Sequence, residues 1–212
     1  MQDGRQIFEQ TVTLPVPIAE AFAWHARPGA LQRLIPPWEL ATVLRQQGGI
    51  ADGAQVELVT KLGPLRLRWL AEHYGYDPPH RFCDRLVKGP FAMWEHTHAF
   101  EAAEGHSGCV LRDHIEYRLP GGWLGRLLAG RMVQKKLRQM FAYRHATTLH
   151  DLAAHAQYGR QGSMRIAITG ASGLIGSDLC ALLTTAGHQV TRLVRHQPGE
   201  GEIYWNVKDQ EI

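Results

Sequence analysis

Residues 94–100 have the sequence Trp-Glu-His-Thr-His-Ala-Phe, in which aromatic side chains and two histidines occupy every second position. Alternate side chains of a β-strand point to one face, so the pattern predicts a strand with positions 94, 96, 98 and 100 facing inward. Comparable runs extend over residues 6–118, separated by turn signals at 48–49, 63–64, 77–79, 89–90 and 105–108. This spacing is typical of consecutive antiparallel hairpins, interrupted only by short helical segments at 17–26 and 29–34.

The sequence changes character after residues 120–122, Pro-Gly-Gly, because no proline occurs between 123 and 156. Apolar side chains recur there at steps of three and four residues, which predicts one long amphipathic helix. The members of this stripe are Leu124, Leu127, Leu128, Met132, Leu137, Met140, Phe141, Thr148 and Leu149.

The same helix carries basic side chains on its other face: Arg131, Lys135, Lys136, Arg138 and Arg144. Contact with nucleic acid or with lipid head groups is one interpretation of this face. Because no aromatic side chains are interleaved with the charges on this same face, and because the net charge of the chain is only +3, we interpret it as a solvated face and expect no nucleic-acid partner.

The composition of the 212 residues, 44% hydrophobic and 20% charged, is that of a globular protein and excludes a collagenous or largely disordered chain. No apolar run approaches the roughly 18 residues of a membrane span. The cysteines are odd in number, with no Cys-x-x-Cys spacing: Cys83, Cys109 and Cys180. The count argues against a disulfide framework or a thiolate zinc site and predicts a cytoplasmic protein.

A different pattern begins at Met164. A buried-type strand at 165–169 runs into a turn at 170–176, Gly-Ala-Ser-Gly-Leu-Ile-Gly, and a helix and a second strand at 189–195 follow. The helix is expected to bury a face made of Ile175, Leu179, Leu182, Leu183 and Ala186. With two strands at most, this unit predicts the beginning of a doubly wound sheet cut short, whose apolar surface is covered by the N-terminal part or by a partner chain, as in a homo-oligomer, or is mobile.

The glycines of this turn suit a dinucleotide, because they permit a tight turn, let backbone N–H groups approach a pyrophosphate, and let the helix pack closely on the strand. The expected cofactor-binding residues are Gly170, Ser172, Gly173, Leu174, Ile175, Gly176 and Arg195. An acidic residue at the end of the second strand would select NAD. Arg195 stands there instead, and a guanidinium suits a 2′-phosphate, so NADP is favoured over NAD.

Residues 164–205, with this turn and the later Tyr204-Trp205-Asn206, resemble the extended short-chain dehydrogenase/reductase superfamily, in particular its YfcH-like sugar-nucleotide epimerases. The resemblance implies cofactor binding within a longer parent protein, an NADP-dependent epimerase or oxidoreductase. In that superfamily the catalytic Tyr-x-x-x-Lys pair lies well downstream of the nucleotide loop. The spacing occurs here only at Tyr204 and Lys208, shortly after the second strand, so the resemblance does not make this chain an enzyme.

Residues 6–156 resemble the START-like superfamily, in particular polyketide cyclase/dehydrase-like domains, through residues 8–17, 21–24, 94–100 and 111–117. The implied fold class is α+β, a helix-grip in which a curved antiparallel sheet surrounds a long C-terminal helix, followed by a truncated α/β Rossmann unit. We expect a ligand-binding domain over 1–157, a linker over 158–163 and the first part of a nucleotide-binding domain over 164–212. The helix-grip implies an apolar cavity for a small hydrophobic or aromatic ligand.

Strand alternation indicates which side chains would line such a cavity. They are Leu67, Trp69, His73, Trp94, His96, His98, Leu111, Asp113 and Tyr117, closed by Met132, Met140 and Phe141 from the long helix. His96 and His98 have the spacing of two metal ligands on one strand face. We interpret them instead as hydrogen-bonded interior groups and expect no metal. Asp113 is expected to pair with one of these histidines.

Three functions remain open at this point. The N-terminal domain presents or senses a ligand within the NADP-dependent parent protein, or it is itself a cyclase or dehydrase acting through His96, His98 or Asp113, or it is a non-catalytic carrier of lipids or aromatic compounds.

Overall fold

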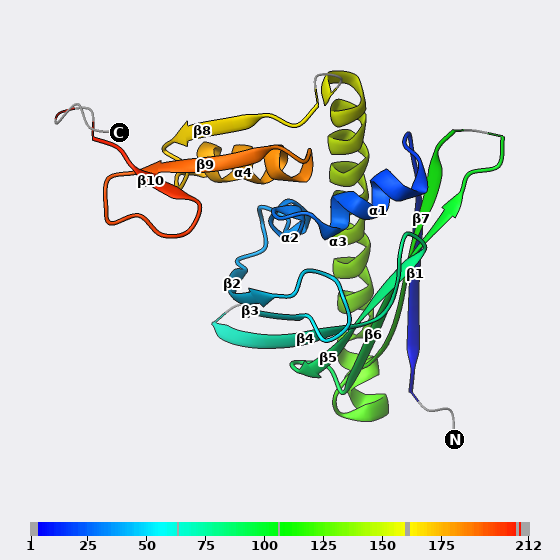
Figure 1. Cartoon of the computed structure of the whole chain (residues 1–212). Helices are drawn as coiled ribbons and strands as arrows, with labels where there is room; N and C mark the ends of the chain where they lie inside the picture. The colour runs from blue at the N-terminus through cyan, green and yellow to red at the C-terminus, as the bar shows by residue number, and fades with distance from the viewer. Residues whose placement is uncertain (1–3, 63, 106, 160–161, 207, 209–212) are drawn as a thin grey trace.

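The protein was analysed as a computed structural model that describes residues 4–62, 64–105, 107–159, 162–206 and 208. Its larger part is a curved antiparallel sheet of seven strands (Figure 1). The strands are β1 (Gln6–Leu14), β2 (Thr42–Gln47), β3 (Gln55–Leu62), β4 (Leu65–Asp77), β5 (Arg81–Lys88), β6 (Met93–Ala102) and β7 (Cys109–Arg118). They follow the order β1-β7-β6-β5-β4-β3-β2, so consecutive hairpins form the sheet and β1 closes it against β7.

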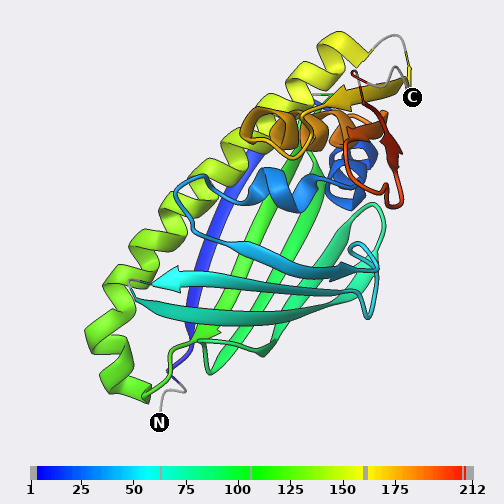
Figure 2. The same cartoon turned by 90° about the vertical axis from the view of Figure 1, so that its left-hand side faces the viewer.

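Three helices accompany this sheet: α1 (Ile18–Ala26), α2 (Ala30–Leu34) and α3 (Gly122–Tyr158). Helix α3 is 37 residues long and runs obliquely past the sheet, packed against β1 (Figure 2). The α+β helix-grip predicted from the alternating strands and the final helix is therefore confirmed. Within the part of the chain that the structure describes, no helix has both the length and the apolar composition needed to cross a bilayer.

The interior of the grip contains two apolar clusters. One joins α1 to the end of the sheet through Phe22, Trp24 and Phe100, with Leu152 of α3 beneath them. The other fills the middle of the grip with these residues: Phe8, Trp94, Ile115, Tyr117, Leu119, Leu137 and Phe141. Burial of side chains of this size contributes about 1.5–3 kcal/mol each, so the two clusters account for the attachment of the helices to the sheet.

The apolar stripe expected along α3 is only partly buried. Leu137 and Phe141 are in the core, but Leu124, Leu127 and Leu128 are exposed, the last at 83%. Met132, expected to close the cavity, is likewise 54% exposed. The first turns of α3 lie at the lower end of the sheet (Figures 1 and 2), and Met132 is on the solvent side of the helix, since its neighbours Ala129 and Val133 pack against the cluster around Phe141.

The basic face of α3 also differs from the expectation at one residue. Arg131, Lys135, Lys136 and Arg138 are exposed. Arg144 is half-buried: its Nε donates to the carbonyl oxygen of Leu34 at 3.1 Å, and its guanidinium lies 5.1 Å from the ring centroid of Phe141. This arginine therefore links α3 to α2 rather than facing solvent.

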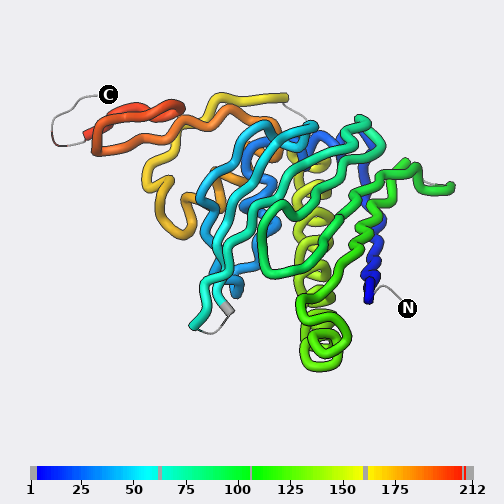
Figure 3. The backbone as a smooth tube through the Cα atoms, turned by 90° about the horizontal axis from the view of Figure 1, so that it is seen from below, coloured from blue at the N-terminus to red at the C-terminus, as the bar shows by residue number. Residues whose placement is uncertain are grey.

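The C-terminal part contains β8 (Arg165–Thr169), α4 (Leu174–Thr185), β9 (Gln189–Val194) and β10 (Glu202–Tyr204). All three strands are parallel, in the order β10-β9-β8. The expectation of two strands at most is wrong, because the short β10 adds a third strand beside β9. Figure 3 shows this small sheet extending from one end of the helix-grip.

Helix α4 buries only part of the face expected, since Leu183 packs against the small cluster and Leu182 and Ala186 are half-buried. Ile175 and Leu179 are 82% and 40% exposed, whereas Cys180, Ala181 and Thr185 are buried. Cys180 belongs to the small cluster with Ile168 of β8, so this side of α4 covers the parallel sheet. Ala181 and Thr185 are buried because the other side of α4 packs against α2 of the helix-grip.

Contacts between α4 and the helix-grip are close. Nη1 of Arg27 donates to the carbonyl oxygen of Thr185 at 2.8 Å and also pairs with Glu20 at 2.8 Å. A Cβ atom added at Gly29 would lie 2.6 Å from Oγ1 of Thr184 and 2.7 Å from the carbonyl oxygen of Ala181. On one side of the small sheet, Ile166 and Ile168 are covered by α4 of the same unit, and α4 in turn packs on the N-terminal part.

We predict that Gly29→Ala weakens this packing. Gly29 has φ +93°, so alanine there is strained by about 1–2 kcal/mol in addition to the clash with α4. Gly49→Ala is the matched control, since Gly49 also has positive φ, +66°, but nothing lies within 4 Å of its Cβ position. Hydrogen exchange should show faster exchange across α4 in Gly29→Ala alone. Equal exchange in the two variants would contradict the packing described here.

Candidate functional site

Four polar side chains meet on the inner face of β5, β6 and β7. The sheet register explains this, because Asp84 of β5 is the cross-strand partner of His96, and His98 is the partner of Asp113 on β7. Directly opposed side chains on one face lie about 4.5–5.5 Å apart at their Cβ atoms, close enough for imidazole and carboxylate groups to touch. We refer to Asp84, His96, His98 and Asp113 as the polar cluster.

Asp113 is the centre of this polar cluster. Nε2 of His96 donates to its Oδ1 at 2.9 Å, and Nδ1 of His98 lies 2.7 Å from the same oxygen. The other oxygen, Oδ2, accepts a hydrogen bond from Nε2 of His145 on α3 at 2.6 Å. The pairing expected for Asp113 is therefore present, and it involves three histidines rather than one.

Asp84 approaches the same two rings from the opposite side. Its Oδ2 is 3.2 Å from Nδ1 of His96 and 3.4 Å from Nε2 of His98. Each imidazole thus has one nitrogen toward Asp84 and the other toward Asp113. The ring centroids of His96 and His98 are 3.8 Å apart.

Burial and charge act against each other in the polar cluster. Burial by itself raises the pKa of both carboxyl groups, but the neighbouring histidines reverse this and hold the pKa of Asp84 and Asp113 well below the ordinary value. Burial lowers the pKa of the His96 imidazole, and the two carboxylates overcome it and raise that pKa. The cluster therefore holds ionised carboxylates in a nearly dry interior, which requires positive charge beside them.

Three neighbours of the site were not predicted. Asp84 lies on β5, where Phe82, Asp84 and Leu86 follow the same period of two as residues 94–100, and this alternation is the signal for it. His145 follows Phe141 by four residues, the spacing of one helix face. His25 of α1 is buried, its Nδ1 lies 2.8 Å from the carbonyl oxygen of Ala21, and burial lowers its pKa to about 4.

The residues expected to line a cavity fall into two groups. Trp94, Leu111, Tyr117 and Phe141 are buried within the packed interior. By contrast Leu67, Trp69, His73 and Met140 are only half-buried, although Trp69 packs inward against Trp94 with ring centroids 5.4 Å apart. Met132 lies outside both groups, on the exposed part of α3.

This division follows the order of the strands. Inner-face side chains of β7 and β6 are closed off, as shown by exposures of 0% for Tyr117 and 7% for Trp94. Inner-face side chains of β4 remain half-exposed. Within the polar cluster the same gradient appears: the side chains of His96 and Asp113 are 3% exposed, His98 is 12% and Asp84 is 18% exposed. Solvent therefore reaches the interior from the side of β4 and β5.

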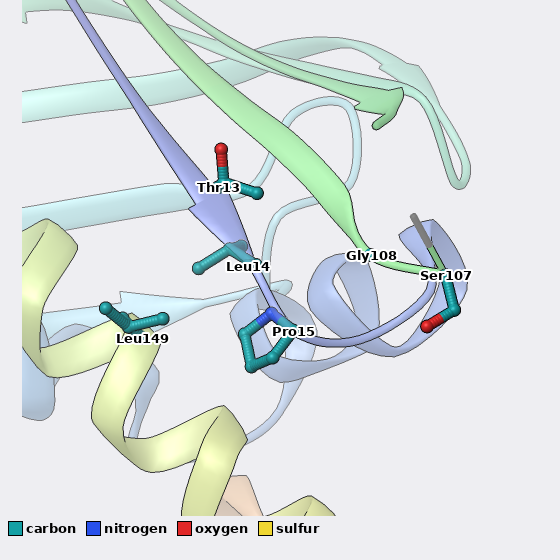
Figure 4. A pocket seen from close by; sticks show the side chains of 6 residues that line it. All are labelled: Thr13, Leu14, Pro15, Ser107, Gly108 and Leu149. Carbon is teal, nitrogen blue, oxygen red and sulfur yellow. The ribbon is translucent and has the colours of Figure 1, made fainter. Parts of the chain in front are cut away.

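Two surface hollows lie elsewhere. A hollow of about 490 Å³ is lined by Trp38, Gln139, Ala142 and Tyr143. A second hollow of about 290 Å³ lies where the end of β1 and the start of β7 meet α3, and Figure 4 shows its lining by Thr13, Leu14, Pro15, Ser107, Gly108 and Leu149. None of the side chains expected to line the cavity lies among the residues of these two hollows.

The glycine-rich turn between β8 and α4 has the geometry expected of it. Gly170 has φ +65°, and the N–H of Gly173 donates to its carbonyl oxygen at 2.9 Å. A methyl group at position 176 would overlap that same oxygen, so only glycine allows α4 to start this close to the strand. Arg195 follows β9 directly and is exposed. Because β8 and β9 are parallel, Arg195 and the turn lie at the same edge of the sheet.

Comparison with known families gives two matches along the chain. The family described as polyketide cyclase / dehydrase and lipid transport matches residues 14–144. The NAD dependent epimerase/dehydratase family matches residues 166–205. Two mycobacterial proteins described as epimerase family proteins, from Mycobacterium bovis and Mycobacterium tuberculosis, are each 49% identical over 48 residues, which is 22% of this chain and 16% of theirs.

Solved structures show similarity to both parts. A nucleoside-diphosphate sugar epimerase from Corynebacterium glutamicum superposes with a TM-score of 0.74 at 30% identity, over 94% of this chain and 41% of that one. The chain thus spans less than half the length of this relative. Norcoclaurine synthase from Thalictrum flavum, with a TM-score of 0.57 and 12% identity over 72% of this chain and 96% of that one, shares the fold of the helix-grip.

We predict that Asp113→Ala lowers the free energy of unfolding by about 3–5 kcal/mol, because removing one partner leaves the buried imidazoles without their shared acceptor. Urea denaturation measures this change. The control is Glu9→Ala, which removes an exposed carboxylate 3.0 Å from Nδ1 of His114 and should have a much smaller effect. Equal losses in the two variants would show that the polar cluster does not stabilise the grip.

Proposed function

Because the chain belongs to the polyketide cyclase / dehydrase and lipid transport family, we propose that its helix-grip binds a small hydrophobic or aromatic ligand that carries a polar group. The observation that carries this proposal is the gradient of exposure across the inner face of the sheet. Over β7 and β6 the aromatic side chains and the polar groups are buried. Over β4 and β5 the aromatic and polar side chains of the same inner face are partly exposed.

The accessible side offers both kinds of contact. Trp69 is half-buried and lies 5.4 Å from both Phe91 and Trp94 in ring centroids, so it presents an apolar wall. His98 and Asp84 are the two members of the polar cluster with appreciable exposure. An apolar wall with a few convergent polar groups is the usual form of a small-molecule site.

Native mass spectrometry of the purified chain tests the proposal first, since a retained ligand appears as added mass. A hydrophobic fluorophore, anilinonaphthalene sulfonate, then serves as a probe for titration. We predict that Trp69→Ala weakens probe binding about tenfold or more, because losing a buried aromatic contact costs at least ~1.4 kcal/mol.

Trp123→Ala is the matched control for this titration, since Trp123 is 69% exposed on the far part of α3. It should leave the affinity unchanged. Circular dichroism of both variants confirms that they are folded. The proposal fails if the two variants bind the probe equally well, or if the wild-type chain retains no ligand and binds no probe.

For residues 164–212 we propose NADP binding, with residues 1–157 as the ligand-binding part and 158–163 as the link between them. The fit of the glycine-rich turn supports this proposal: Gly170, Ser172 and Gly173 are exposed where the turn leads into the N-terminus of α4, and the N–H groups of a helix N-terminus favour an anion. Arg195 at the same sheet edge would bind the 2′-phosphate. The cofactor supplies hydride chemistry when bound. We propose that the longer relatives of this chain use it as epimerases or oxidoreductases.

We predict that Arg195→Gln reduces the affinity for NADPH at least tenfold and leaves the affinity for NADH unchanged, because only NADPH carries the 2′-phosphate. Titration followed by cofactor fluorescence measures both. Gly176→Ala should abolish binding of both cofactors, whereas Gly159→Ala, where an added Cβ meets nothing within 4 Å, should not. An equal loss for NADPH and NADH in Arg195→Gln would contradict the preference for NADP.

A further inference from the structure

We propose that Asp84, His96 and His98 form a binding site for one divalent transition-metal ion, with one carboxylate oxygen and two imidazole nitrogens as ligands. The three ligand atoms, Oδ2 of Asp84, Nδ1 of His96 and Nε2 of His98, lie within 4.8 Å of one another. The proposal does not depend on the organic ligand proposed above, because it concerns only these side chains.

The spacing around Asp84 fits tetrahedral coordination. Zinc binds imidazole nitrogen and carboxylate oxygen at about 2.0–2.2 Å, so two ligand atoms at a tetrahedral angle are about 3.3–3.5 Å apart. Oδ2 of Asp84 is 3.2 Å from the nitrogen of His96 and 3.4 Å from that of His98. Both separations are at or beyond the long end of the range for N–H···O hydrogen bonds, which centres on about 2.9–3.0 Å.

The second nitrogen of each ring supplies an independent argument. A histidine that binds a metal almost always donates its other N–H to a carboxylate or carbonyl group, which fixes the ring and its tautomer. Here Nε2 of His96 donates to Oδ1 of Asp113 at 2.9 Å, and Nδ1 of His98 lies 2.7 Å from the same oxygen, close enough for an ion pair but without the geometry of a hydrogen bond. His145 holds the other oxygen of Asp113 at 2.6 Å. The rings are therefore oriented so that their remaining nitrogens both face Asp84.

The charge of the site also favours a cation. Two carboxylates flank the same pair of rings in a region where the side chains of His96 and Asp113 are only 3% exposed. Uncompensated charge in such an environment is costly, so with neutral imidazoles as ligands a divalent ion between Asp84 and the two rings would balance both carboxylates. Histidine nitrogen and carboxylate oxygen together suit zinc and other first-row divalent metals rather than calcium or magnesium.

Solvent reaches the site through its more exposed members. Asp84 and His98 are 18% and 12% exposed, and His73 of the half-buried β4 is the cross-strand partner of Asp84. Three protein ligands leave the fourth tetrahedral position open, as in catalytic rather than structural zinc sites. That position faces the accessible side of the grip, where a water molecule or an oxygen atom of a ligand would complete the coordination.

The test uses the full chain, stripped of metal by a chelator, and Zn²⁺ alone as the probe. Isothermal titration should show one equivalent of tightly bound zinc, and Zn²⁺ should raise the melting temperature. We expect Asp84→Asn and His98→Gln to weaken zinc binding at least 100-fold and to abolish the thermal shift. Asp113→Asn, which changes only the support of the rings, should weaken it by 10–100-fold.

His114→Gln is the matched control, because the chain has 12 histidines and His114 lies on the outer face, paired with Glu9. It should bind zinc as the wild type does. Asp84→Asn preserves the size of the side chain and alters the most exposed member of the site, so we expect this variant to fold. It therefore tests the site even if His98→Gln does not fold. Co²⁺ provides a second measurement, since a tetrahedral site gives intense visible absorption that Asp84→Asn should remove.

The proposal is overturned if the wild type takes up no stoichiometric Zn²⁺, or if Asp84→Asn and His114→Gln bind zinc equally. Because the titration with Zn²⁺ contains no organic ligand and no nicotinamide cofactor, a failure to bind zinc does not contradict the functions proposed above. Conversely, a chain that binds zinc but no hydrophobic probe would support the metal site and contradict the ligand-binding proposal.

Discussion

The buried carboxylate of Asp113 is the constraint on which the rest of the helix-grip depends. An ionised carboxylate in the interior must have hydrogen-bonding partners, and Asp113 obtains them from β6 and from α3. The bond to His145 sets how α3 lies along the sheet, since a shift of one turn would separate the two groups by about 5.4 Å. The ring of Phe141, one turn earlier on α3, packs 5.2 Å from Phe8 of β1 and supports the same placement.

A second polar interaction, an ion pair, connects α2 to α3. Arg33 of α2 makes two hydrogen bonds, of 2.9 and 2.8 Å, to the carboxylate of Asp151 on α3. Paired bonds of this kind are stronger and more directional than a single contact. These bonds fix the position of α2 on α3, and α4 packs in turn against α2. The absence of a side chain at Gly29 allows α2 and α4 to approach closely. The parallel sheet is thus attached to the grip through the packing of α4 on α2 and through the hydrogen bond from Arg27 to Thr185.

The same arrangement explains why the interior is asymmetric. The clusters around Phe141 and around Trp24 fill the space over β1, β7 and β6. Beyond β5 the sheet continues, and the inner-face side chains of β4, Trp69 and His73 among them, are only half-buried. The family relationship indicates a ligand-binding domain, and this uncovered part of the inner face is where such a ligand would meet both aromatic and polar groups.

Much of this was accessible from the sequence. The period of two in residues 94–100 and 111–117 predicted which faces of β6 and β7 turn inward, and with them the meeting of His96, His98 and Asp113. The glycine spacing at 170, 173 and 176 predicted the strand, turn and helix of the C-terminal part. These features are local, because a repeat of two or a glycine at a tight turn is determined by backbone geometry within a few residues.

Only the tertiary structure decided the remainder. The participation of Asp84 depends on the register between β5 and β6, and that of His145 depends on where α3 crosses the sheet. Likewise, the apolar repeat of α3 specified a helix with an apolar side, but not that Leu127 and Leu128 on that side would remain exposed to solvent. Periodicity specifies which side of an element is apolar. What that side packs against depends on contacts between residues far apart in the chain, and no local pattern records them.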